Sequence, residues 1–160
     1  MKSLVVYDSQ FGNTRKIAEA IGKALEESGK GMVRHVSDVQ AGDLMGLNIL
    51  VVGTPTQRFA ATPAVKNWLN QLPTEALEGV RGAAFDTRFT QEKIDEIPVL
   101  AFFVRLFGYG AEPIARKLSD KGVRVEIEPE GFYVGDTEGP LLENELQRAR
   151  EWAQKIFRSG

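Results

Sequence analysis

The sequence predicts an α/β protein: a doubly wound parallel sheet with helices covering both faces. Two observations lead to this fold class. Apolar, strand-like runs alternate with helix-period patterns along all 160 residues, as in chains that fold through right-handed crossovers between parallel strands. Residues 48–53 are the clearest strand, because their apolar residues follow one another without interruption, as expected of a central parallel strand. The length and the absence of a repeat or linker predict a single domain over residues 1–160.

The first half of the chain supplies three of the expected strands, at residues 4–7, 32–36 and 48–53. A helix is expected over residues 13–27, where apolar residues recur at helical spacing on one face. A further helix follows Thr62-Pro63, because threonine is a common N-cap and proline is favoured at the first helical position.

The second half is expected to add a fourth strand at residues 82–85 and a helix at 113–121. The fifth strand is interrupted and is built from residues 123–127 and 132–134. A last helix starts near Pro140, with acidic residues early and basic residues late, which matches the helix dipole. Its expected buried face consists of Leu142, Leu146, Ala149, Trp152, Ala153 and Ile156.

Composition excludes several classes of function. The formal net charge of −2 gives no support to nucleic-acid binding, which needs a basic surface. The chain has no cysteine and a single histidine, which excludes thiol chemistry and argues against a catalytic triad or a histidine metal site. His35 itself is expected to have no role. The apolar segment 97–107 is too short to span a bilayer, and the start of the chain shows no signal peptide, so we expect a cytoplasmic protein.

The turn between the first strand and the first helix is the first candidate site. It reads Ser-Gln-Phe-Gly-Asn-Thr, with small polar groups and a glycine but no lysine. Helix N-termini bind anions through free N–H groups and the positive end of the dipole. Neither the triphosphate-binding lysine motif nor the dinucleotide glycine pattern is present, so the turn suits a phosphate monoester. The alternative is an ordinary helix cap. The candidate residues are Ser9, Gln10, Phe11, Gly12, Asn13 and Thr14.

Two further loops follow the third and fourth strands, at residues 54–63 and 86–91. Each contains hydroxyl side chains, one arginine and one phenylalanine. Because ligands in such sheets bind beyond the carboxyl ends of the strands, these loops indicate a flat aromatic ligand with a phosphate tail. The alternatives place the phenylalanines in the core and the arginines in solvent. The candidate residues are Thr54, Pro55, Thr56, Gln57, Arg58, Phe59, Asp86, Thr87, Arg88 and Phe89.

Taken together, these motifs resemble those of the flavodoxin family of FMN-binding proteins, and the resemblance covers almost the whole chain. The matched positions are Ser9, Gly12 and Thr14 in the phosphate loop, residues 53–55 (Gly-Thr-Pro) in the second loop, residues 85–87 (Phe-Asp-Thr) in the third, and residues 131–156 at the end. The resemblance implies a five-stranded sheet of order 2-1-3-4-5, with the phosphate of FMN held by the first loop.

The resemblance also implies a function. A flavodoxin-like electron carrier passes single electrons between redox partner proteins, a reductase and an acceptor, and needs no catalytic side chain or metal. The alternative is an FMN-dependent NAD(P)H oxidoreductase that acts on quinones or similar acceptors. A protein that only stores or senses FMN is a further alternative. A phosphorylated receiver domain is set aside because Gly53 stands where that family needs an aspartate.

Two segments depart from the family pattern. Phe11 stands where the family often has a hydroxyl side chain. Residues 90–107 are longer and more apolar than a minimal family member needs, which indicates a lid or an interaction surface over the flavin ring. The alternative is an extra helix buried against the sheet.

Overall fold

A computed structural model describes residues 1–56 and 60–158, so Gln57, Arg58 and Phe59 lie outside the described residues. The strands are β1 (Lys2–Tyr7), β2 (Lys30–His35), β3 (Ile49–Pro55), β4 (Arg81–Phe89), β5 (Arg124–Val125) and β6 (Glu130–Val134). The α-helices are α1 (Asn13–Glu26), α2 (Ala41–Leu44), α3 (Pro63–Gln71), α4 (Gln91–Asp95), α5 (Pro98–Phe107), α6 (Ala111–Asp120) and α7 (Glu145–Arg158), with a short 3₁₀ turn at Val36–Asp38. The predicted alternation of strands and helices is confirmed.

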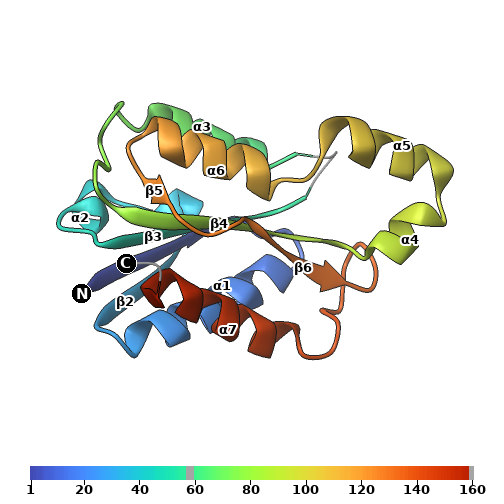
Figure 1. The fold of residues 1–160 in the computed structure, drawn as a ribbon, viewed down its shortest axis with the longest axis horizontal. Helices are drawn as coiled ribbons and strands as arrows, with labels where there is room; N and C mark the ends of the chain where they lie inside the picture. The colour runs from blue at the N-terminus through green and yellow to red at the C-terminus, as the bar shows by residue number, and fades with distance from the viewer. Residues whose placement is uncertain (57–59, 159–160) are drawn as a thin grey trace.

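All neighbouring strands of the sheet are parallel and follow the order β2-β1-β3-β4-β5, which confirms the predicted topology (Figure 1). The outer position beside β4 is shared by two short strands. β5 pairs with the start of β4, and β6 pairs with its end, from Phe85 to Phe89. This is the interrupted fifth strand that the sequence predicts. A single domain over residues 1–160 stays a prediction.

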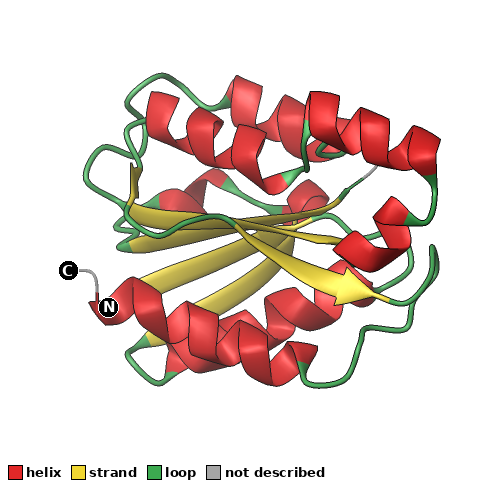
Figure 2. Cartoon of the chain, turned by 45° about the vertical axis from the view of Figure 1, so that its right-hand side comes forward, coloured by secondary structure: helices red, strands yellow, loops and turns green. Residues whose placement is uncertain are grey.

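The two faces of the sheet bury two separate apolar cores. Leu50 and Val52 of β3 pack with residues of α3 and α6 on one face, whereas Ile49 and Val51 pack with α1 and α7 on the other. All four side chains are fully buried. Figure 2 shows the resulting three layers, with helices above and below the strands. The continuous apolar run at residues 48–53 is therefore explained by burial on both faces.

The last helix begins at Glu145, so the prediction of a start near Pro140 is wrong. The N–H of Leu142 donates to the carbonyl of Tyr133 at 2.9 Å, and the chain before α7 follows β6 instead of turning into a helix. Leu142 and Leu146 are 38% and 41% exposed, so they do not belong to the buried face. The other expected members, Ala149, Trp152, Ala153 and Ile156, are buried.

The fourth strand is longer than predicted because β6 pairs along its second half. β4 extends to Phe89, four residues beyond the expected end at Phe85. Asp86, Thr87 and Arg88 therefore lie on a strand with fixed alternation of their side chains, rather than in a loop. The alternation fixes the face of the sheet toward which each of these side chains points.

Candidate functional site

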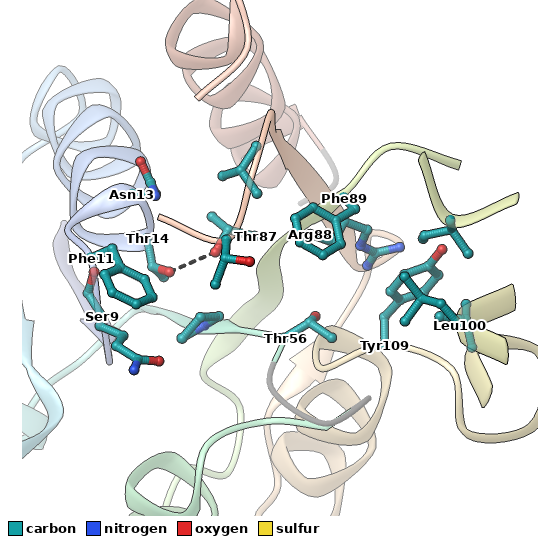
Figure 3. Close-up of a pocket in the computed structure, with 16 residues that line it drawn as sticks. Ser9, Phe11, Asn13, Thr14, Thr56, Thr87, Arg88, Phe89, Leu100 and Tyr109 are labelled. Atoms are coloured by element: carbon teal, nitrogen blue, oxygen red, sulfur yellow. Dashed lines mark hydrogen bonds between the residues drawn. The ribbon is translucent and has the colours of Figure 1, made fainter. Parts of the chain in front are cut away.

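A cavity of about 510 Å³ opens at the carboxyl end of the sheet, between the turn before α1 and the helices α4 and α5 (Figure 3). It brings together residues from all three predicted loops. The predicted residues on its wall are Ser9, Gln10, Phe11, Asn13, Thr14, Pro55, Thr56, Thr87, Arg88 and Phe89. Of the other candidates, Gly12 lies within the same turn, whereas Thr54 and Asp86 are fully buried behind the wall. Contact of these residues with a ligand stays a prediction.

The polar end of the cavity is the N-terminus of α1. Gly12 is the N-cap and has φ +89°, in the left-handed region that favours glycine. Its N–H donates to Ser9 Oγ at 3.1 Å, which closes the turn. Gly12 has no side chain with which to cap the helix, but Ser9 Oγ also accepts a hydrogen bond from the N–H of Arg15 at 3.4 Å, and the first turn contains no acidic residue. The positive end of the α1 dipole therefore faces the cavity, and no carboxylate lies on the described wall there; the carboxylate of Asp8, before the turn, accepts a hydrogen bond from the N–H of Ser9 at 2.8 Å.

Two contacts fix this turn to distant parts of the chain. The hydroxyl groups of Thr14 and Thr87 are 2.8 Å apart, which joins α1 to β4. The side-chain amide of Asn13 donates to the carbonyl of Glu138 at 3.0 Å, which joins α1 to the segment after β6. Asn13 and Thr14 are both buried. The turn is thus held in place by the protein itself, which reduces the ordering that a ligand must supply.

The other end of the cavity is apolar and is covered by α4 and α5. Sequence reasoning missed the wall residues Ile94, Leu100, Val104, Tyr109, Val134 and Thr137. The apolar character of residues 90–107 indicated a cover, but only the helix geometry decides which of its side chains point inward. No described side chain of α5 is buried, so the alternative of a helix buried against the sheet is wrong.

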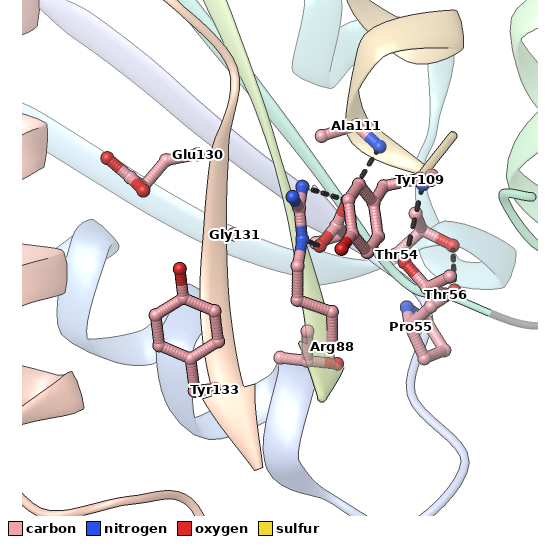
Figure 4. A network of polar contacts seen from close by, with 12 residues as sticks. Thr54, Pro55, Thr56, Arg88, Tyr109, Ala111, Glu130, Gly131 and Tyr133 are labelled. Carbon is pink, nitrogen blue, oxygen red and sulfur yellow. Dashed lines mark hydrogen bonds and ion pairs between the residues drawn. The ribbon is translucent and has the colours of Figure 1, made fainter. Parts of the chain in front are cut away.

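Beside this end lies a polar network in which Arg88 and Ala111, both labelled in Figure 4, donate hydrogen bonds to Asp86. Its carboxylate accepts hydrogen bonds from Nε and one terminal nitrogen of Arg88, at 2.5 and 2.7 Å, and from the N–H of Ala111 at 2.9 Å. The Arg88 guanidinium lies 3.7 Å from the centroid of the Tyr109 ring, in a cation–π contact. A Cβ at Gly131 would collide with Arg88, so this glycine on β6 leaves the space that the arginine fills.

Burial and charge act against each other in this pair. Burial raises the pKa of the Asp86 carboxyl above its ordinary value, and the hydrogen bonds and charge of Arg88 offset part of that effect. Burial acts to lower the pKa of Arg88, but the hydrogen bonds and charge of Asp86 outweigh it, and the pKa is raised. The side chain of Arg88 is only 13% exposed, so the alternative of a solvated surface arginine is wrong.

The electrostatic character of the wall follows from these contacts. Among the described residues, the wall contains one cation, Arg88, and no carboxylate. Phe89 is half-buried at the wall rather than in the core, with the Lys93 ammonium 4.8 Å from its ring centroid. The cavity thus combines a positive, hydrogen-bonding end with an apolar, aromatic end. That combination suits an anionic group attached to a flat apolar one.

The single histidine of the chain lies outside the cavity. His35 ends β2, with Nε2 3.1 Å from Asp8 Oδ1 and Nδ1 2.8 Å from Ser37 Oγ, and it does not line the cavity. Within residues 1–56 and 60–158, no group of three or more acidic, histidine or cysteine side chains is arranged to hold a metal ion. No helix in that part of the chain is long and apolar enough to cross a membrane.

The fold and the cavity define a doubly wound α/β protein with a cavity at the switch point of its strand order. Residues 5–135 match the sequence model of the family described as Flavodoxin. The chain therefore belongs to the flavodoxin family, whose cofactor is a flavin.

Individual relatives agree with this placement. A flavodoxin of Clostridium saccharobutylicum is 30% identical over 89 residues, covering 54% of this chain and 56% of the relative. The matched segments span between 36% and 62% of the length of three curated flavodoxins.

Solved structures show the same fold. An archaeal flavodoxin superimposes with a TM-score of 0.74 at 23% identity, covering 99% of this chain and 97% of that one. Rubredoxin oxygen:oxidoreductase of Desulfovibrio gigas gives a TM-score of 0.73 at 18% identity, and there the match covers 99% of this chain but 35% of the other.

Proposed function

We propose that this chain is an FMN-binding electron carrier that passes single electrons between protein partners. One observation carries the proposal. The N-terminus of α1, with the neutral Ser9 hydroxyl and no acidic residue in its first turn, opens into a cavity whose far end is apolar and aromatic. A phosphate monoester joined to a flat ring system matches both ends. Membership of the flavodoxin family supports FMN as that ligand.

The donor set fits the phosphate of FMN. A Cβ built on Gly12 meets no atom within 4 Å, so the space above the turn is open to a ligand. The N–H groups of the first turn of α1 provide donors, and the hydroxyl groups of Ser9 and Thr14 lie beside them. The resulting cradle is neutral apart from the helix dipole. It holds one phosphate group, and no second nucleotide-binding motif is present to hold the adenylate of FAD.

The remaining residues would orient the ring and exclude water. We infer that Thr54, Pro55 and Thr56 form one side of the ring site, together with Gln57, Arg58 and Phe59 outside the described residues. Asp86, Thr87, Arg88 and Phe89 form the other side from β4, with Asp86 acting through Arg88. Leu100 and Val104 of α5 cover the site.

Bound FMN supplies the one-electron chemistry. The protein then needs no acid or base, in agreement with a wall that has no carboxylate in the described part of the chain.

The two other expectations concern partners and location. Transfer between a reductase and an acceptor is the activity we propose, and no specific observation favours direct oxidation of NAD(P)H. A location in the cytoplasm stays a prediction.

Ligand preference is tested by equilibrating the apoprotein with FMN, FAD and riboflavin and following flavin fluorescence. We expect FMN to bind more tightly than riboflavin by well over tenfold, because charge-assisted hydrogen bonds to the phosphate are each worth roughly 1.5–3 kcal/mol. FAD is expected to bind more weakly than FMN. Equal affinity for FMN and riboflavin would contradict a phosphate site at α1.

The activity is tested by visible spectra of the FMN-loaded protein under anaerobic conditions. A carrier stays oxidised after addition of NADH or NADPH and is reduced by a flavodoxin reductase or by dithionite. Reduction within seconds by NADH or NADPH alone would instead establish the oxidoreductase.

A further inference from the structure

The outward face of α5 exposes several large apolar side chains. Val99, Phe102 and Leu106 are 66%, 60% and 62% exposed. Their spacing of three and four residues places them on one stripe of the helix. Leu100 and Val104 lie on the opposite side and line the cavity. The helix is therefore apolar on both sides, but only the inner side has a role in the proposed flavin site.

An apolar stripe of this kind is rarely left in water. Helices that are hydrophobic all round are normally buried, and monomeric proteins seldom expose continuous apolar patches beyond a few hundred Å². Ile97, the residue just before the helix, is also 47% exposed. In Figures 1 and 2, α5 lies beyond the end of the sheet, and no helix or strand among the described residues lies over its outer side. A second molecule is needed to bury it.

The charges at the two ends of α5 indicate which molecule that is. Asp95 and Glu96 precede the N-terminus, and Arg105 lies in the last turn beside the apolar stripe. If a second α5 packs antiparallel to the first, each Arg105 comes near the acidic end of the other copy. The same opposite-charge contact then forms twice, as two-fold symmetry requires. A parallel arrangement would instead place the two arginines together.

The same charges disfavour a lipid surface as the occupant. Helices that lie in a membrane interface carry several lysine or arginine residues on the polar face, which attract anionic lipids. α5 contains one arginine, and the preceding α4 contributes Glu92 and Asp95, with Glu96 next in the chain. Lys93 of α4 is already engaged with Asp136 at 3.4 Å.

We propose that two copies of this chain pair through α5 as an antiparallel, two-fold symmetric dimer. The stripe of Val99, Phe102 and Leu106 forms the centre of the contact, and Arg105 pairs with the acidic end of the partner helix at each side. Because a single short helix supplies the contact, the interface is at the small end of specific interfaces and the dimer is weak and concentration-dependent. The contact adjoins the cover of the cofactor cavity.

Sedimentation velocity of the full chain, from low micromolar to near-millimolar concentration, measures the association directly. We expect the weight-average sedimentation coefficient to rise with concentration from the monomer value toward the dimer value. Leu106→Glu and, separately, Val99→Glu should each weaken dimerisation more than tenfold. Leu146→Glu is the matched control, because Leu146 is an exposed leucine on α7, in the helix layer on the other face of the sheet. It should leave the dimer unchanged. Circular dichroism at low concentration confirms that each variant is folded.

A charge exchange tests the antiparallel arrangement. Arg105→Glu and Glu96→Arg should each weaken the dimer, and the double variant should recover most of the loss because each end then meets an opposite charge again. A chain that sediments as a monomer at every concentration would overturn the proposal. So would equal effects of Leu106→Glu and Leu146→Glu, or no recovery in the double variant. A monomer that floats with phosphatidylcholine vesicles, and loses this property in Leu106→Glu, would replace the second copy with a lipid surface.

Discussion

The N-termini of α1 and α6 lie at the same edge of the sheet but are completed in opposite ways. α1 begins after Gly12 with no acidic residue in its first turn, and the side chain that accepts a hydrogen bond from this turn is the neutral hydroxyl of Ser9. At α6, the buried carboxylate of Asp86 accepts a hydrogen bond from the N–H of Ala111, and Glu112 stands in the first turn. One helix end is thus left for an outside anion, and the other holds an anion from the chain itself.

This difference gives a physical reason to expect a phosphate at the N-terminus of α1 and not at that of α6. The dipole and N–H groups attract anions at every such end. The sequence distinguishes the two ends by placing a carboxylate at α6 and no acidic residue in the first turn of α1. Placing the Asp86 carboxylate at α6 is energetically unfavourable unless the buried charge is paired. Arg88 supplies that pairing, and Gly131 leaves room for it.

Giving α1 an internal carboxylate should remove the difference between the two helix ends. In Thr14→Asp, the new charge lies where the phosphate is expected. Two unit charges about 4 Å apart repel by roughly 4 kcal/mol at an effective dielectric near 20. We expect FMN affinity to fall by about a thousandfold in a fluorescence titration of the apoprotein. Thr14→Ser, which keeps the hydroxyl group, serves as the control and should bind nearly as well as the parent chain. Unchanged affinity in Thr14→Asp would place the phosphate elsewhere.

Removing the carboxylate at α6 should damage stability rather than ligand binding at α1. Asp86→Asn leaves the largely buried Arg88 without its counter-charge, and breaking a buried pair in this way costs about 3–5 kcal/mol. Urea denaturation of the apoprotein measures the change in the free energy of unfolding. The matched control is Glu19→Gln, which breaks the exposed pair of Arg15 and Glu19 and should have no measurable effect. If Asp86→Asn and Glu19→Gln changed the free energy of unfolding equally little, the stability of the protein would not depend on the carboxylate at the α6 N-terminus.

Two neighbouring phenylalanines on β4 sharpen the contrast between site and core. Phe89 is half-buried at the cavity wall, whereas Phe85 is fully buried between Phe132 and Trp152. We expect Phe89→Ala to weaken FMN binding by about 0.5–1.5 kcal/mol, the usual value of an aromatic contact, with little loss of apoprotein stability. Phe85→Ala should instead lower the free energy of unfolding by about 3–5 kcal/mol. A stability loss of that size in Phe89→Ala would assign it to the core.

The smallest expected effect concerns the reduction potential of bound FMN. A unit charge about 8 Å away contributes roughly 2 kcal/mol at an effective dielectric near 20, or about 90 mV for one electron, and solvent screening reduces this to a few tens of millivolts. Asp86 offsets Arg88, so the double variant Asp86→Asn with Arg88→Gln should barely shift the potential. Arg88→Gln alone should shift it to more negative values, because Asp86 is left as an unpaired anion.

The pH dependence of that shift follows from the pKa of Asp86. Burial already raises this pKa, and Arg88 offsets part of the rise, so loss of the arginine raises it further. The negative shift in Arg88→Gln should therefore be present at alkaline pH and disappear as the pH falls and Asp86 takes up a proton. Spectroelectrochemistry of both variants across pH checks this. A shift that is independent of pH would mean that Asp86 stays ionised without its partner.

The companion change Arg58→Gln, at a residue outside the described part of the chain, is also expected to shift the potential to more negative values.

Local sequence signals determined the alternation of elements and the position of the anion-binding turn. The strand at residues 48–53, the Thr62-Pro63 helix start and the turn from Ser9 to Thr14 lie where the sequence places them. Each depends on residues that are adjacent in the chain, such as an apolar run, a proline at the first helical position or a glycine before a helix. These preferences act over a few residues, so they can be predicted from the sequence without the rest of the fold.

Contacts between distant segments decided the rest. β4 extends to Phe89 because β6 pairs with its second half. α7 begins only at Glu145 because the residues after β6 run back along that strand. The pairing of Asp86 with Arg88 requires the alternation of an extended strand and the space left by Gly131. The direction in which Leu100 and Leu106 point depends on how α5 lies over the cavity. None of these is encoded by a local preference, because each arises only when segments far apart in the sequence are packed together.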